Sequence, residues 1–95
     1  MIAHYDSEAR SLAIDLAADT RHGQTREVAT NVIVGIRDGQ AVMVEVILAD
    51  AVGFDGLDVA AREFALDREA LHAAANAARS APDRDVDITV ARAAA

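Results

Sequence analysis

The chain has 95 residues, a net charge of −7 and no cysteine. This length corresponds to a single domain, residues 1–95. The missing cysteine excludes disulfides, thiolate metal sites and a cysteine nucleophile. A protein that binds the phosphate backbone of a nucleic acid normally shows a basic patch. Here the arginines are scattered singly from Arg10 to Arg92, so we expect no direct nucleic-acid binding.

The apolar runs are much shorter than the roughly 20 residues that span a bilayer. The start of the chain also lacks the basic and apolar segments of a signal peptide. We therefore expect no membrane contact and a cytoplasmic location.

The first half of the chain predicts short strands, because apolar and polar residues alternate there. A polar turn follows Tyr5, where the Asp6 side chain can accept a hydrogen bond from the nearby backbone. Before the centre of the chain, the strands are expected over residues 2–5, 11–17 and 25–29.

The strongest signal lies in residues 31–48, which read as a β-hairpin. Asp38-Gly39 between two runs of β-branched residues is typical of a type I′ turn, which needs positive φ at both central positions. Counting outward from this turn predicts the residues that oppose one another and share a face. On one face these pairs are Ile36 and Ala41, Val34 and Met43, and Val32 and Glu45; on the other they are Gly35 and Val42, Ile33 and Val44, and Asn31 and Val46.

In this register both faces of the hairpin are mostly apolar, whereas an antiparallel sheet commonly exposes one polar face to water. One clear helix is predicted, which is enough to cover one face. We therefore expect a homodimer, or a different protein partner, to cover the other face. The alternative is that residues 51–66 fold over it. The residues expected at the dimer interface are Val32, Val34, Ile36, Met43 and Ile47.

The second half begins with a turn-rich connection over residues 49–56. Residues 57–66 are ambiguous, because their apolar positions fit a helical stripe, whereas residues 62–66 alone fit a strand; we favour the strand. Asp67 is a good N-cap and predicts a helix over residues 68–80. The buried stripe of that helix is expected to contain Leu71, Ala74, Ala75 and Ala78.

Pro82 prevents this helix from continuing. Residues 86–90 alternate strictly and predict a final strand, and Ala93–Ala95 are expected to fray. The elements together predict an α+β fold: an antiparallel sheet of four to six strands built on the central hairpin, with one helix from the C-terminal half packed on one face. Residues 2–50 would form a β-meander, and residues 57–91 a strand–helix–strand extension.

The first half also resembles a known family. The residues that carry the likeness are Ile2, the turn Tyr5-Asp6-x-Glu8-Ala9, the alternating Leu12, Ile14 and Leu16, the Glu27-Val28 segment, Val32-Ile33-Val34, and the strand Val44-Glu45-Val46-Ile47-Leu48. This order resembles the short bacterial family catalogued as domain of unknown function 2283, over residues 2–50. The resemblance implies a small antiparallel β-domain and, since some members of such families are described as antitoxin-like, a regulatory role.

Glu45 is the polar residue that stands out, because it interrupts an apolar strand and a carboxylate there needs a partner or a raised pKa. It is the one candidate for a catalytic acid or base, with His4, Tyr5 and Asp6 as candidate ligand-binding neighbours. The alternative is that Glu45 has a structural role. It would then pair with an arginine, lie near the edge of the sheet, or lie across a dimer axis. His4, His22 and His72 lack the spacing of metal ligands, so no metal site and no cofactor are expected.

Two classes of function fit these observations. The first is a non-enzymatic, homodimeric protein-interaction or regulatory domain, which the two-faced hairpin and the missing catalytic motifs favour. The second is a small-molecule-binding protein or minor enzyme that uses Glu45 as acid or base.

Overall fold

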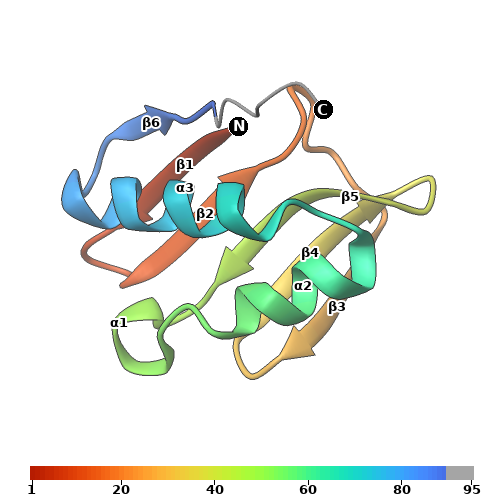
Figure 1. Cartoon of the computed structure of the whole chain (residues 1–95), viewed down its shortest axis with the longest axis horizontal. Helices are drawn as coiled ribbons and strands as arrows, with labels where there is room; N and C mark the ends of the chain where they lie inside the picture. Colours follow the sequence, from red (N-terminus) through yellow and green to blue (C-terminus); the bar gives the residue numbers. More distant parts are fainter. Residues whose placement is uncertain (90–95) are drawn as a thin grey trace.

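The computed structural model describes residues 1–89 (Figure 1). Six strands and three helices follow one another in this part of the chain. In chain order they are β1 (Ile2–Asp6), β2 (Ser11–Asp15), β3 (Gln24–Ala29), β4 (Val32–Arg37), β5 (Gln40–Val46), α1 (Ala49–Val52), α2 (Gly56–Phe64), α3 (Arg68–Ser80) and β6 (Asp85–Asp87).

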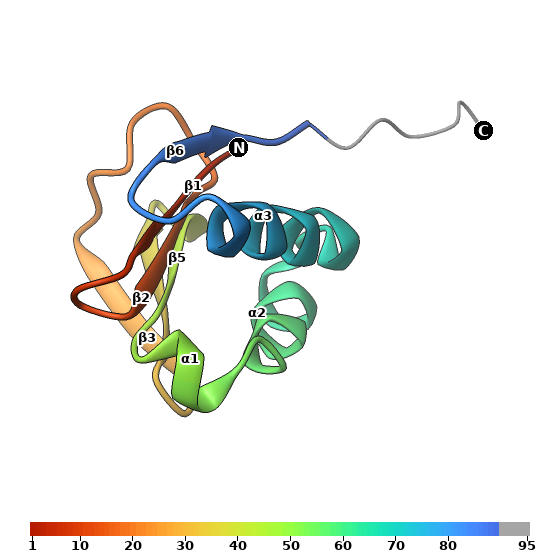
Figure 2. The same ribbon diagram turned by 90° about the vertical axis from the view of Figure 1, so that its left-hand side faces the viewer.

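The six strands form one antiparallel sheet in the order β3-β4-β5-β2-β1-β6. The predicted α+β fold with an antiparallel sheet of four to six strands is therefore confirmed. The expectation of one helix is wrong, since α1 and α2 precede α3. Seen edge-on in Figure 2, α2 and α3 lie on the same side of the sheet. We call the other side the open sheet face.

The central hairpin forms as predicted at its turn. Asp38 and Gly39 have φ values of 54° and 78°, as a type I′ turn requires. Arg37 pairs with Gln40 and Ile36 with Ala41. Beyond these pairs the predicted register is wrong, because β5 contains a β-bulge.

Val42 is the extra residue of this bulge, since Gly35 pairs with Met43 while the next residue of β4 pairs with Ala41. The bulge shifts all pairs beyond it by one residue, and a shift of one residue exchanges the two faces of a strand. Val34 therefore opposes Val44, and Ile33 opposes Glu45.

The shift sorts the hairpin into two unlike faces. Four valines share the face under the helices and are at most 1% exposed: Val32, Val34, Val44 and Val46. The open sheet face receives Ile33, Met43 and Glu45 instead, all of which are half-buried. The expectation that both faces are mostly apolar is therefore wrong, because it depended on a hairpin without a bulge.

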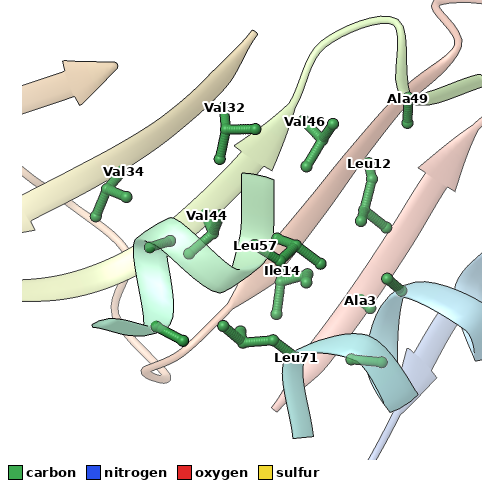
Figure 3. Close-up of a cluster of buried hydrophobic side chains, with 14 of the residues drawn as sticks. Ala3, Leu12, Ile14, Val32, Val34, Val44, Val46, Ala49, Leu57 and Leu71 are labelled. Carbon is green, nitrogen blue, oxygen red and sulfur yellow. The ribbon is translucent and has the colours of Figure 1, made fainter. Parts of the chain in front are cut away.

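The core fills the space between the sheet and the helices. Figure 3 shows Val44, Val46 and Ile14 of the sheet facing Leu57 of α2 and Leu71 of α3. Alanines line much of the remaining helix surface, so α3 packs closely on the sheet. The predicted stripe of Leu71, Ala74, Ala75 and Ala78 is confirmed as buried.

The helix α3 begins as the sequence predicts. The Asp67 carboxylate accepts a hydrogen bond from the Ala70 N–H at 3.2 Å, which satisfies a free amide of the first turn. The last strand, β6, spans Asp85–Asp87 rather than the predicted 86–90. Val90 of that prediction, and the predicted fraying of Ala93–Ala95, lie outside the described residues.

The preference for a strand over residues 62–66 is wrong, because α2 continues to Phe64. Its buried side chains are Leu57, Ala60 and Ala61, which lie three and four positions apart on one helical face. The alternative of a helical stripe was therefore the correct one. No helix in residues 1–89 is long and apolar enough to cross a membrane.

Gly56 allows α2 to approach the sheet. A Cβ atom added there would collide with Cγ2 of Val32 and lie 3.2 Å from Cβ of Ala29. We expect Gly56→Ala to lower the free energy of unfolding by about 1–3 kcal/mol, because a β-strand beneath a helix yields little to extra volume. Gly23→Ala is the matched control, since nothing lies within 4 Å of that position. Equal urea midpoints for the two variants would contradict this packing.

Candidate functional site

The open sheet face is built from two rows of side chains that cross all six strands. Cross-strand pairing places one residue of each strand in each row. From β3 to β6, the first row is Glu27, Ile33, Glu45, Ala13, His4 and Asp85, and the second is Thr25, Gly35, Met43, Asp15, Ile2 and Asp87. Carboxylates therefore alternate with apolar side chains across the face.

Glu45 and Asp15 are the unusual members of these rows. Both are half-buried, and neither forms a hydrogen bond or ion pair with any residue in the range 1–89. Glu45 has Ile33 and Ala13 as its cross-strand neighbours. The expectation that Glu45 pairs with an arginine is thus not met within the described chain. A half-buried carboxylate without a partner is partly desolvated and attracts cationic groups.

The structure brings together three of the four residues singled out around Glu45. Glu45, His4 and Asp6 line one hollow of about 350 Å³ on the open sheet face, together with Ser11 and Ala13. Tyr5 does not join them, since its neighbours His4 and Asp6 point to the opposite face and its own side chain packs against the core.

The other polar groups around this hollow already form hydrogen bonds within the chain. His4 Nδ1 lies 2.9 Å from Asp85 Oδ1, and Asp6 Oδ1 accepts the backbone N–H groups of Glu8 and Ala9 at 3.0 Å each. The second contact confirms the predicted self-bonded turn. The Ser11 hydroxyl donates to the Ala9 carbonyl, so it is not activated by a histidine. This set can hold an ammonium or guanidinium group, but it offers no hydroxyl bonded to a histidine as the nucleophile of a hydrolytic site.

Metal binding finds no support in the described chain. Among residues 1–89, no group of three or more histidine and acidic side chains converges in a way that could hold an ion.

The loop of residues 16–23 covers one end of the open sheet face. It must pass over β5 and β4 to connect β2 with the edge strand β3, and Figure 2 shows it on the side away from the helices. Its anchor at the sheet is Gly35, where an added Cβ atom would lie 2.9 Å from Nδ1 of His22 and 2.7 Å from Cγ of Met43. The imidazole of His22 therefore packs on the bare backbone of β4.

Arg37 ties the same loop to the sheet. Its guanidinium donates to the Arg21 carbonyl at 3.1 Å and lies 3.3 Å from Asp19. Arg21 bonds the same carboxylate and, with Arg37, lowers the pKa of Asp19 to about 2. The hollow of about 510 Å³ beside these residues thus has its cations already paired with Asp19, and we assign it a structural role.

The residues expected at a dimer interface do not form one surface. Val32, Val34 and Ile36 are no more than 5% exposed beneath the helices of the same chain. Met43 lies on the open sheet face, and Ile47 follows the end of β5, where its N–H donates to the Asn31 carbonyl. The surface predicted for self-association is therefore divided between two sides of the sheet. Self-association itself stays a prediction.

A separate polar cluster joins α2 to α3 on the helical side. Oδ1 of Asp58 lies 2.6 Å from His72 Nε2 and 2.8 Å from Arg68 Nε. These contacts, chiefly the hydrogen bond from His72, lower the pKa of Asp58. The His72 side chain is only 24% exposed because of this contact. The cluster stabilises the fold.

The lowered pKa of Asp58 fixes the direction of a pH effect. A carboxyl group with a lower pKa in the folded state adds stability above its unfolded pKa, and this stability is lost as the pH falls through the folded pKa. We therefore expect Asp58→Asn to lower the melting temperature at neutral pH. The gap from the parent chain should be full at neutral pH and close as the pH is lowered below 3.8, the ordinary pKa of an aspartate. A gap that stays constant in thermal melts over this range would contradict the assignment.

Comparison with known proteins adds no relative: no family model, no curated protein and no solved structure matches this chain. The resemblance of residues 2–50 to the bacterial β-domain family thus stays a prediction.

The sequence pointed to Glu45, His4 and Asp6, but it did not point to Ile33 or Asp85 as their neighbours. The sequence signal that could have found the open sheet face is the polar residue that lies on the other side of a strand from its buried residues. In β2, for example, Asp15 points away from the side of Leu12 and Ile14.

Proposed function

We propose that this chain is a non-enzymatic, cytoplasmic protein-interaction domain that binds a second protein on its open sheet face. The observation that carries this proposal is the combination of half-buried apolar side chains with half-buried, unpaired carboxylates on one uncovered surface. Ile33, Ala13 and Met43 are the apolar members, and Glu45 and Asp15 are the carboxylates. A regulatory, antitoxin-like role would act through the same binding.

Two features favour a different protein over a second copy of this chain at that surface. Facing copies would bring their acidic rows together, and like charges across an interface oppose association. The net charge of −7 adds to this repulsion. A homodimer through the open sheet face would therefore tighten as salt is added. Light scattering at low and high salt measures this, and a stable dimer at low salt would favour self-association instead.

The binding proposal is tested by two matched variants, each of which replaces an alanine by arginine. Ala13→Arg places a long cation at the centre of the open sheet face beside Glu45, whereas Ala73→Arg places one on the exposed side of α3. The tagged parent chain and both variants are used to recover binding proteins from the native host, which mass spectrometry identifies. We expect the parent and Ala73→Arg to recover the same protein and Ala13→Arg to lose it. Equal recovery by all three chains would refute the proposal.

A second candidate is the binding of a small cationic ligand in the hollow that gathers Glu45, His4 and Asp6. This hollow is the observation that favours it, and Glu45 would be the acid or base of any reaction there. Glu45→Gln distinguishes the two candidates. A small-molecule binder would lose its ligand, or an enzyme its turnover, with this single change. If the open sheet face binds a protein through both rows, this change would lower the affinity for the partner without abolishing binding.

A further inference from the structure

Resting on the proposed function, we infer that the partner presents lysine or arginine side chains, separated by small apolar residues, to the open sheet face. The partner is thus a basic segment of a protein. Three properties of this surface lead to the inference: its charge, the absence of arginine counter-ions for its carboxylates within residues 1–89, and the spacing of two of those carboxylates.

The charge of the open sheet face is strongly one-sided. Its two rows and the adjoining end of β1 carry six carboxylates: Asp6, Asp15, Glu27, Glu45, Asp85 and Asp87. Against them stand the imidazole of His4, the N-terminal ammonium group 3.7 Å from Asp87, and Arg37, whose guanidinium is already paired with Asp19. A surface with this balance attracts cationic partners and repels anionic ones.

The arginines of the chain do not neutralise this face. Every ion pair that an arginine forms within residues 1–89 uses a carboxylate elsewhere, namely Asp19, Asp50, Asp58 or Glu63. Arg26, for example, belongs to the edge strand β3 but reaches Glu63 and the ring of Phe64 on the helical side. The described chain thus supplies no arginine counter-ion to Glu45 or Asp15.

The spacing of the carboxylates indicates how the basic groups are arranged. Glu27 and Glu45 lie in the same row on β3 and β5, with Ile33 of β4 between them. Neighbouring strands lie about 4.8 Å apart, so these carboxylates are about 10 Å apart across the sheet. A chain in the polyproline II conformation rises about 9 Å in three residues and returns every third side chain to the same side. A segment with a basic residue at every third position, and small residues between, therefore matches this pair of carboxylates.

The probe that tests this inference is a fluorescein-labelled peptide of repeated Lys-Ala-Gly units, followed by fluorescence anisotropy at low salt. Two double variants are compared, each of which removes two carboxylates. Asp15→Asn with Glu45→Gln changes the open sheet face, and Asp55→Asn with Glu69→Gln changes exposed positions at the N-terminal ends of α2 and α3. Both raise the net charge from −7 by the same amount, so a general effect of charge would weaken both equally.

We expect the parent chain to bind the peptide and the open-face variant to bind it about tenfold or more weakly, because desolvated carboxylates contribute more than exposed ones. The control variant should change the Kd by less than about twofold, as exposed charges typically do. Ala13→Arg should also abolish binding, and it keeps both carboxylates. Equal weakening by the two double variants, or no binding by the parent chain, would overturn the inference.

Two further outcomes identify which claim has failed. If spermine at the same charge concentration binds as tightly as the peptide, the surface is a site for small polyamines and the inference of a protein segment is wrong. If Ala13→Arg loses its host protein but the peptide does not bind, docking on the open sheet face stands and only the basic partner is refuted. If Ala13→Arg keeps its host protein, the proposed function itself fails.

Discussion

Val44→Lys is expected to abolish folding, whereas Met43→Lys is expected to leave the chain folded. The two residues are neighbours in β5, but Val44 is 0% exposed in the core and Met43 is half-buried on the open sheet face. A buried charge without a partner costs about 3–5 kcal/mol or more, which is a large share of the roughly 5–15 kcal/mol that holds a small domain together. At position 43 a lysine would instead face Asp15 directly across on β2.

Circular dichroism and urea unfolding show whether each of these two variants is folded. The comparison is sensitive to the bulge at Val42, since a regular hairpin would place Met43 under the helices and Val44 on the outer face. A folded Val44→Lys variant beside an unfolded Met43→Lys variant would show that the hairpin adopts the regular register.

Leu57→Ala is expected to be the most destabilising simple truncation in the helical layer. Leu57 begins the buried stripe of α2, is 0% exposed, and lies beside Ile14 and Val44 of the sheet in Figure 3. Removing a buried leucine side chain costs about 2–5 kcal/mol, because the transfer free energy is lost and a cavity remains. The free energy of unfolding from urea titration should fall by that amount, with an unchanged slope against urea.

Val59→Ala is the control for that change, because Val59 lies in the same helix but is only half-buried. It should cost about 1 kcal/mol or less, since less apolar area is lost and alanine is the better helix former. Similar losses for the two variants would mean that α2 does not pack on the sheet through Leu57.

Local chemistry made part of this fold predictable from the sequence. The Asp38-Gly39 turn and the Asp67 cap each depend on a few adjacent residues, and both form as expected. The strands of the first half also follow from alternation within single segments. In contrast, the bulge at Val42 depends on packing between strands, since β5 is held by β4 on one side and by β2 on the other.

The helix α2 shows why a short window misleads. Residues 62–66 alternate as a strand would, but Leu57, Ala60 and Ala61 reach the core only if the segment is helical. The chain then ends the helix with Ala65 at φ 53°, and Leu66 N–H donates to the Ala61 carbonyl. Burial of the helical stripe therefore decided the structure of this segment, and that burial depends on the rest of the fold.

The candidate site was predictable only residue by residue. Glu45 stood out because a carboxylate interrupts an apolar strand, and the same reasoning drew attention to His4 and Asp6. The rows themselves combine strands that are far apart in the sequence, such as β5 and β1 on either side of β2. Their composition depends on the register of five strand pairs, and the single shift at Val42 changes which residues of the hairpin join them.

The account depends on one property of the isolated chain: the valines of the central hairpin are buried under the helices, and the opposite face of the sheet is open to a partner. Methyl NMR with a soluble gadolinium chelate tests this most directly, using Ile33 and Met43 against Val34 and Val44. We predict strong relaxation enhancement for the methyl groups of Ile33 and Met43 and little for those of the two valines. Equal protection of all four residues would show that the second face is covered, and strong enhancement of the valines would reverse the assignment of the faces.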